Sequence, residues 1–210
     1  MTRLGSLLFC ATLVLGATFF GCSGGTGGSA NITDLVPRDG TIPGWVVDQS
    51  VSKTSGMVAA TATTEQSVTD LIDGAASDFF AAPYTPKNFA WQNYINASLV
   101  SPQNSTSGST LKLYILQMPS ADQAFNLYTS LLTVNLYNPS SNPWQDPTSP
   151  AIGTKSRIAD SGTDWWVNFC KGVYYVEARM TPSYAADFTP GDVGQKQAAM
   201  DFAVAVAAKM

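Results

Sequence analysis

The side chains of Glu177 and Arg179 are the pair in this sequence that comes closest to an acid–base site. They stand two residues apart in a segment that alternates like a strand, so both lie on the same side of it. In an enzyme, Glu177 could act as a general base while Arg179 holds an anion. A plain surface ion pair is far commoner at this spacing, and it is the interpretation that we favour.

A second acidic pair, Asp70 and Asp73, lies three residues apart on one face of a predicted helix. The two could form a carboxylate pair or help to bind a hard cation such as Ca²⁺. No Asp-x-Asp-x-Asp-Gly loop accompanies them, so a solvated helix face is the better explanation. The sequence therefore predicts no metal site and no cofactor.

Histidine is absent from the chain. Its absence excludes Ser-His-Asp triads, Cys-His dyads and histidine-ligated zinc, because each of these needs an imidazole. An enzyme that uses only Asp and Glu, as glycosidases do, stays open. However, Glu65 and Glu177 are the only glutamates, and no motif pairs either with an aspartate. The net charge of −4 argues against nucleic-acid binding.

The N-terminus has the pattern of a secretory signal. Arg3 is followed by an apolar run at residues 4–20 and then by Gly21 and Cys22. A small residue before a cysteine resembles the lipobox of bacterial lipoproteins, whose cysteine is diacylated and becomes the new N-terminus. The alternative is an uncleaved transmembrane anchor, for which about 17 apolar residues are barely sufficient. We favour the lipoprotein.

Three segments follow from this prediction. Residues 1–21 are the signal peptide, residues 22–33 are the lipidated cysteine with a flexible Gly/Ser-rich tether, and residues 34–210 form one domain. With Cys10 removed and Cys22 acylated, Cys170 has no intramolecular partner, so no disulfide is expected. A lone cysteine is more often a small buried hydrophobe than a reactive thiol.

The first half of the domain is predicted to contain an edge strand, a helix and two further strands. The edge strand follows a Pro-Gly turn and includes Trp45. The helix begins near Thr64 as one amphipathic segment and stops before Pro83. The two strands cover residues 89–100 and 111–118, and the polar stretch between them, at 101–109, predicts a long, mobile loop.

The second predicted helix has the clearest start in the chain. Ser120 and Gln123 form a capping box, in which the hydroxyl accepts from the backbone N–H of Gln123 and the amide reaches back. The predicted apolar stripe of this helix consists of Ala121, Ala124, Phe125, Tyr128 and Leu132. An irregular stretch at residues 137–150 follows it.

The strongest local prediction is a hairpin of residues 164–170 and 173–180 around a Lys171-Gly172 turn. The predicted cross-strand pairs are Phe169–Tyr174, Val167–Val176 and Trp165–Ala178. Partners point to the same side, so these six side chains form a core face. The other face is polar and unusually aromatic, and it is a candidate binding surface made of Trp166, Asn168, Tyr175, Glu177 and Arg179, which is either open to solvent or covered by helices.

A strand near residues 152–159 and a closing helix from about Val193, with Phe202 in its apolar stripe, complete the domain. Together the elements predict an α+β fold. It is a largely antiparallel sheet of about five to seven strands with three helices packed on it, in the order β-α-β-β-α-β-β-β-α.

Four short motifs cover most of residues 35–180: Pro43-Gly44-Trp45, Ile72-Asp73-Gly74-Ala75-Ala76, the Met118, Ser120, Ala124 and Phe125 pattern, and Gly172, Tyr174, Tyr175 and Val176. They resemble a family of uncharacterised bacterial exported proteins, many of them lipoproteins, catalogued as a domain of unknown function. Asp73 stands where that family usually has Asn, and Asn126 stands where Gly is common. The resemblance implies export but supplies no activity.

These observations lead us to expect a lipoprotein of the bacterial cell envelope, facing the periplasm or the exterior. A lipid on Cys22, such as palmitate, would hold it to a membrane. A non-enzymatic binding or accessory module is favoured over a carboxylate-based hydrolase, because no catalytic constellation is present. The expected partners are the membrane and either an envelope protein or a small ligand, whereas nucleic acid is not expected.

Overall fold

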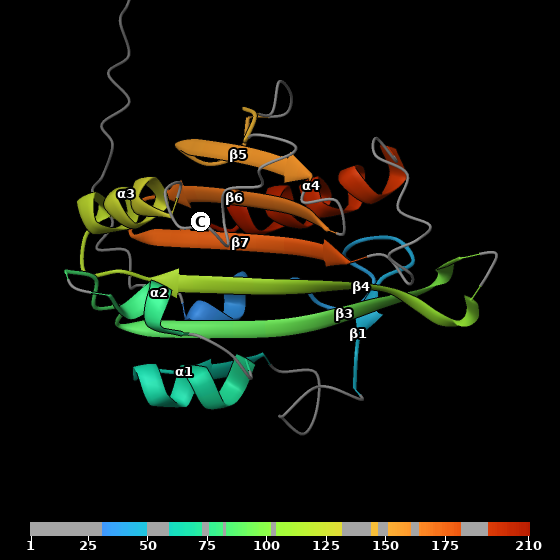
Figure 1. Cartoon of the computed structure of the whole chain (residues 1–210), viewed down its shortest axis with the longest axis horizontal. Helices are drawn as coiled ribbons and strands as arrows, with labels where there is room; N and C mark the ends of the chain where they lie inside the picture. Colours follow the sequence, from blue (N-terminus) through green and yellow to red (C-terminus); the bar gives the residue numbers. More distant parts are fainter. Residues whose placement is uncertain are drawn as a thin grey trace, which may run out of the picture.

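A seven-stranded antiparallel sheet forms the centre of the protein in the computed structural model (Figure 1). β1 (Val46–Val47) and β2 (Ala60–Ala62) both pair with β3 (Asn88–Ser101). The sheet continues from β3 through β4 (Asn104–Gln117), β7 (Tyr174–Thr181), β6 (Trp165–Lys171) and β5 (Lys155–Asp160).

The structure describes residues 31–49, 59–72, 76–81, 83–101, 104–131, 144–146, 151–160, 164–181 and 193–210. At residues 97–101, 104–108, 160 and 193–195 the structure describes the backbone. The predicted signal peptide, Cys22 and most of the tether lie outside the described residues, as does most of the irregular stretch at 137–150.

Helices cover both faces of the sheet. α4 (Val193–Ala207) packs on β6 and β7 from behind in Figure 1, and α3 (Ala121–Ser130) packs on the same strands from the front. α1 (Glu65–Ile72) and α2 (Ser77–Phe80) lie on the side of α3, next to β2 and β3, and a short 3-10 helix, η1 (Ile32–Leu35), contacts β3. We call the two sides of the sheet the α4 face and the α3 face.

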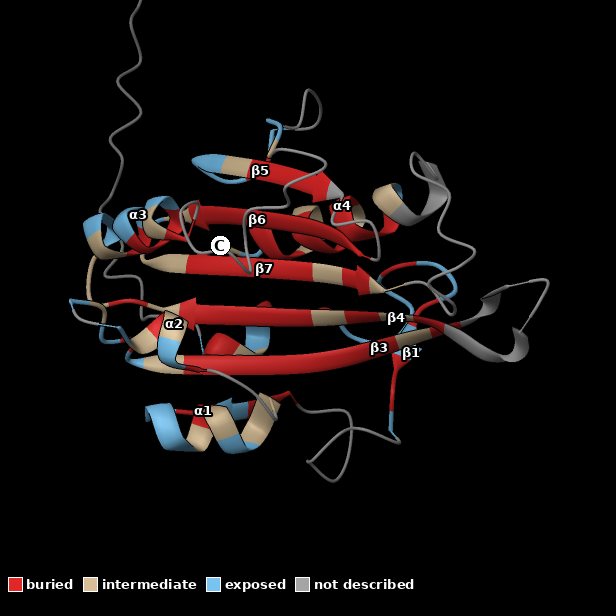
Figure 2. Ribbon diagram, in the orientation of Figure 1, coloured by how far each residue is buried: buried red, intermediate tan, exposed pale blue. Residues whose placement is uncertain are grey.

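Each face has its own apolar core, because successive side chains of a strand point to opposite sides. The core of the α4 face includes Tyr94, Leu113, Val167, Phe169, Val176 and Phe202. The core of the α3 face includes Val68, Phe79, Phe89, Leu116, Leu127 and Tyr175. Figure 2 shows that the central strands are buried along most of their length. The α+β prediction is confirmed, although β2 and η1 were too short to be recognised.

The single helix predicted from Thr64 is two helices in the structure. α1 ends at Ile72 and α2 begins at Ser77, and residues 73–75 between them lie outside the described residues. The predicted stripe still points inward, since Val68 and Phe79 are both buried.

The predicted loop at 101–109 was wrong. β3 runs to Ser101 and β4 starts at Asn104, so the two strands pair through most of the polar stretch, with irregular register beyond Asn96. Backbone hydrogen bonds between strands do not need apolar side chains, and the Ser and Thr residues here are compatible with an extended backbone.

The hairpin of β6 and β7 exists, but its register differs by two residues from the prediction. Phe169 pairs with Val176 and Lys171 pairs with Tyr174, so the turn residues are Gly172 and Val173. Gly172 has φ = 54°, the positive value that two-residue hairpin turns need at their first central position. A shift of two leaves every side chain on its predicted face.

The predicted capping box at the start of α3 is only half formed. The Ser120 hydroxyl accepts from the Gln123 N–H at 3.2 Å, but the side-chain carbonyl of Gln123 is buried without a partner, and no reciprocal bond is found among the described contacts. The buried stripe is also rotated, because it consists of Ala124, Leu127, Tyr128 and Leu131, while Phe125 is 45% exposed. The stripe at 124, 127, 128 and 131 has the same helical spacing, and packing on β6 and β7 selects it.

The C-terminal helix is confirmed, with Ala199, Phe202, Ala203 and Val206 all buried against the sheet. Lys171 Nζ donates to the carbonyl oxygen of Ala207 at 2.7 Å, which caps the end of α4. No helix among the described residues is long and apolar enough to cross a membrane.

Candidate functional site

The candidate binding surface predicted on the hairpin is not a solvent-facing surface. Asn168 and Tyr175 are fully buried, Glu177 is nearly so, and Trp166 keeps only 7% of its surface exposed. Arg179 alone is partly open, with 37% of its side chain exposed. The face is covered because α2 and α3 place Phe79 and Leu127 on it, which alternation within one hairpin does not reveal.

The structure nevertheless brings the predicted residues into one polar arrangement. Arg157 of β5 pairs in register with Asn168, Asn168 with Glu177, and Glu177 with Tyr114 of β4. We call these four side chains, which cross the middle of the α3 face, the polar row. The sequence did not identify Arg157 or Tyr114 as part of a site, because only the register of four strands places them beside Glu177.

Glu177 is the titratable group at the centre of the polar row. Burial raises the pKa of its carboxyl to about 7, against lowering contributions from Arg179, Arg157 and the Tyr175 hydroxyl. That hydroxyl donates to Glu177 Oε2 at 3.3 Å. A raised carboxyl pKa at a buried position is typical of groups that exchange protons near neutrality.

Arg179 forms its ion pair with Asp164 and not with Glu177, so the predicted Glu177–Arg179 surface pair is wrong. Both Nε and Nη2 of Arg179 contact Asp164 Oδ2, with the Nε bond at 2.6 Å. The Trp166 indole N–H donates to the same oxygen at 3.4 Å. Asp164 is buried, so this pair holds Arg179 in a fixed orientation beside Glu177.

A continuous series of cation–π contacts and one edge-to-face ring contact runs from Arg179 to helix α3. The Arg179 guanidinium lies 4.5 Å from the Trp166 ring centroid, and the Trp166 and Trp144 centroids are 6.4 Å apart. Arg157 lies between the next two rings, 4.6 Å from Trp144 and 4.3 Å from Tyr128. Such contacts are worth more when the cation is desolvated, as Arg157 is.

Several buried polar atoms of the polar row lack hydrogen-bond partners. Arg157 Nη1 donates to the Tyr128 carbonyl oxygen at 2.7 Å, but Arg157 Nε and Nη2 have no partner. Neither the oxygen nor the nitrogen of the Asn168 amide has one. Unpaired polar atoms at buried positions are costly, so a cluster of them calls for an explanation.

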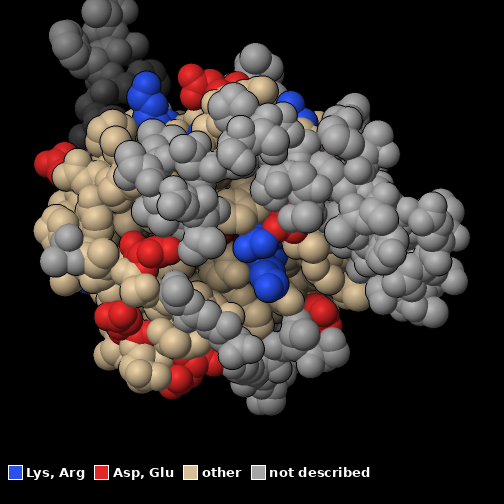
Figure 3. Space-filling model, in the orientation of Figure 1, with Lys and Arg blue, Asp and Glu red and all other residues tan. Residues whose placement is uncertain are grey.

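Lys112 and Arg179 are direct cross-strand partners on the α3 face, and both side chains are partly exposed. Figure 3, which looks onto this face, shows Lys and Arg side chains in a hollow at its centre. Trp91, Tyr114 and Trp166 keep 6%, 8% and 7% of their surfaces exposed beside the two cations. We call the opening bounded by these five residues the central hollow.

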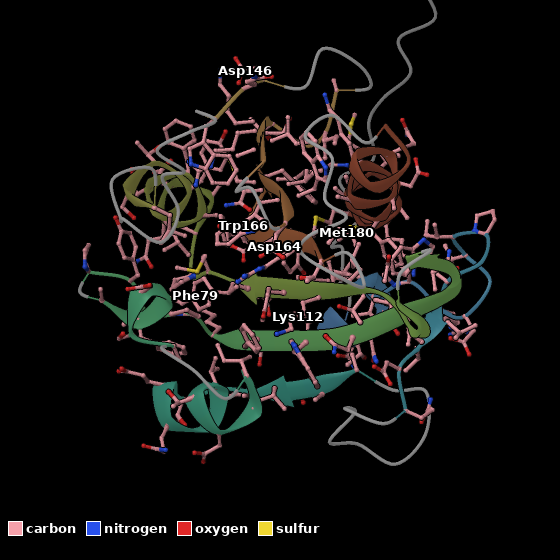
Figure 4. The ribbon with its side chains drawn as sticks, turned by 45° about the vertical axis from the view of Figure 1, so that its right-hand side comes forward. Phe79, Lys112, Asp146, Asp164, Trp166 and Met180 are labelled. Atoms are coloured by element: carbon pink, nitrogen blue, oxygen red, sulfur yellow. The ribbon has the colours of Figure 1, made fainter. Side chains whose placement is uncertain are left out.

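Among the described residues, the two cations of the central hollow are compensated by one paired carboxylate. Like charges directly opposite each other on neighbouring strands are destabilising, and Lys112 faces Arg179 in this way. Asp164 compensates Arg179, whereas no carboxylate among the described residues pairs with Lys112. Figure 4 shows Lys112, Asp164 and Trp166 on the same side of the sheet. The arrangement is suited to an anion that also has an aromatic or apolar part.

The other candidate residues do not contribute to this site. Asp70 is exposed on α1 and accepts from Gln66 Nε2 at 2.7 Å, and Asp73 lies outside the described residues. Within the described part of the chain, no group of three or more Cys, Asp and Glu residues could hold a metal ion.

Cys170 is buried on the α3 face, opposite Tyr175, and burial raises the pKa of its thiol. We therefore expect the native thiol to react slowly with a maleimide at neutral pH and rapidly after denaturation, since the thiolate is the reactive form. Counting modified thiols by mass spectrometry with and without denaturant checks this. Immediate stoichiometric labelling of the native protein would contradict it.

No protein-family model, no curated protein and no solved structure matches this chain. The assignment of a function therefore depends on the geometry of the polar row and the central hollow.

Proposed function

We propose that this protein is a lipid-anchored binding module of the bacterial cell envelope, and that it binds a small anionic ligand in the central hollow. One observation carries the proposal. Lys112, which has no carboxylate partner among the described residues, and Arg179 lie directly opposite each other on neighbouring strands, next to three nearly buried aromatic rings on the α3 face. Concave sites with an apolar lining and a few oriented polar groups are the usual form of small-ligand sites.

The anchoring half of the proposal is supported by Gly21 and Cys22 and by the Gly/Ser-rich tether that follows them. Replacing Cys22 by alanine should abolish lipid attachment, because the thiol is the acylated group. Metabolic labelling with radioactive palmitate, followed by immunoprecipitation, measures this. Equal incorporation into the wild type and Cys22→Ala would refute lipidation at this position.

The binding half can be tested with anilinonaphthalene sulfonate, an aromatic anion whose fluorescence rises when it leaves water. We expect saturable binding to the native protein. Lys112→Glu should weaken it by about tenfold or more, because the substitution removes an attraction and adds a repulsion. Fluorescence titration of the full chain in detergent micelles, with the signal of protein-free micelles subtracted, gives the dissociation constants.

Lys196→Glu is the matched control, because Lys196 lies on α4, on the opposite face, 5.7 Å from the Trp165 ring. It makes the same charge change and should leave the affinity unchanged. Near-UV circular dichroism must stay native in both variants, since this dye also binds loosely packed states. Equal weakening by the two substitutions would show that the dye senses only net charge, and the hollow would not be its site.

A carboxylate-based hydrolase is the second candidate, and the raised pKa of Glu177 is the observation that favours it. A general acid needs such a pKa. Asp164, the nearest second carboxylate on this face, is occupied by two contacts from Arg179. Hydrolysis of nitrophenyl glycosides or esters by the wild type, lost in Glu177→Gln, would establish the enzyme in place of the binding module.

A further inference from the structure

We infer that the free edge of the Arg157 guanidinium is a receptor for an oxyanion, the carboxylate or phosphate group of a small ligand. The inference rests on the proposed binding function. A series of side-chain contacts through Trp144 and Trp166 runs from Arg157 to Arg179 at the central hollow.

The orientation of Arg157 is already fixed. Its Nη1 donates to the Tyr128 carbonyl oxygen at 2.7 Å, and the rings of Tyr128 and Trp144 lie 4.3 Å and 4.6 Å from its Cζ. A long, flexible side chain normally loses rotamer freedom when it binds a ligand. Here that entropy is lost on folding, so the guanidinium is preorganised for its ligand.

The two nitrogens left without partners are the ones that an oxyanion needs. Nε and Nη2 lie side by side along one edge of the planar guanidinium, and their hydrogens point in parallel. This edge matches the spacing of two oxygens of a carboxylate or phosphate, which a lysine ammonium cannot reproduce. Both atoms are buried and unpaired, in a residue that is only 2% exposed. A ligand that accepts hydrogen bonds from both nitrogens would remove the free-energy cost of burying them unpaired.

A third donor stands beside this edge. Asn168 pairs with Arg157 in register, and its amide nitrogen also has no partner. The Tyr175 hydroxyl approaches Arg157 closely enough to interact with the guanidinium, which lowers its pKa against the larger effect of burial, but it does not meet the geometry of a direct hydrogen bond to Nε or Nη2. The Nε–Nη2 edge of Arg157, with its two parallel N–H donors, and the Asn168 amide together form a receptor for a single oxyanion.

Glu177 controls the charge of this receptor. The charged groups around it are Arg157 on β5, Asp164 before β6, Arg179 on β7 and Lys112 on β4, with the hydroxyls of Tyr114, Tyr128 and Tyr175. When Glu177 is protonated, positive charge is in excess and favours an anion. When it ionises, its own carboxylate compensates Arg157. The affinity for an oxyanion should therefore fall as the pH rises through about 7.

Titration of the full chain with sodium acetate and with sodium phosphate tests the inference, with sodium chloride as the ionic-strength control. The Arg157 Nε–H signal in nitrogen–proton NMR spectra should shift saturably with at least one of the two oxyanions, and the stronger of them identifies the ligand group. Thermal unfolding should show that Arg157→Lys lowers the affinity about tenfold, the effect of losing one charge-assisted hydrogen bond. Arg38→Lys, at an exposed arginine, should have no effect.

Glu177→Gln provides a second variant that keeps the Arg157 edge intact, should Arg157→Lys fail to fold. It should bind acetate, whose charge is constant in this range, equally well at about pH 6 and about pH 8, while the wild type weakens between them. No shift of the Arg157 signal with either oxyanion would overturn the inference. If the fluorescent dye still binds in the central hollow, the proposed function survives that result. If neither the oxyanions nor the dye bind, both the inference and the proposed function are overturned.

Discussion

Replacing Phe169 or Phe89 by alanine should each lower the free energy of unfolding by about 3 to 5 kcal/mol, the cost of a large cavity in a packed core. The two side chains are both fully buried, Phe169 on the α4 face and Phe89 on the α3 face. Similar losses are expected because helices cover both faces. Urea denaturation of the two variants and the wild type measures the difference.

Phe125→Ala is the matched control, since it removes the same atoms from a position that is 45% exposed. It should cost no more than about 1 kcal/mol. If Phe89→Ala were as mild as Phe125→Ala, the α3 face would not be a core, and the hairpin surface predicted from alternation would again be open to solvent.

The stability of the protein should fall as the pH rises from about 4.5 to about 7. Burial gives Glu177 a folded-state pKa of about 7 against an ordinary 4.5, so the folded state holds one proton more than the unfolded state in this window. Stability is highest below the unfolded-state pKa and declines up to the folded-state pKa. A shift of this size corresponds to about 3 kcal/mol, lost across the window.

Glu177→Gln removes the titrating group and keeps its shape, so the decline should disappear in this variant. Urea melts at intervals of about half a pH unit give the free energy of unfolding for both proteins. Asp70→Asn, at an exposed carboxyl on α1, should keep the wild-type decline. A decline that persists in Glu177→Gln would mean that another group binds the proton.

Local sequence patterns predicted most of the fold. The alternation of residues 164–180 assigned Val167, Phe169 and Val176 to a core face, and the period of α4 assigned Phe202 to its inner side. The patterns could not set the hairpin register, because a shift of two residues leaves every side chain on the same face of the sheet. The conformation of Gly172 decides between the registers.

The candidate site could be predicted only in part. The list of Trp166, Asn168, Tyr175, Glu177 and Arg179 came from one hairpin, and these side chains do lie together on one face. Their burial depends on where α2 and α3 pack, and Arg157 joins them only through the pairing of β5 with β6. Such long-range pairing leaves no trace in local periodicity, so the sequence patterns predicted neither the burial of these side chains under α2 and α3 nor their pairing with Arg157.

The central claim, that the hollow on the α3 face binds an anionic ligand, is tested most directly by the indole N–H signals of the tryptophans. Trp91 and Trp166 border the central hollow, whereas Trp45 and Trp165 lie in the core of the α4 face. Titration with anilinonaphthalene sulfonate, followed by nitrogen–proton NMR of the full chain, should shift the signals of Trp91 and Trp166 saturably and leave those of Trp45 and Trp165 in place. Shifts confined to Trp45 and Trp165, or no saturable shift at any of the four, would contradict it.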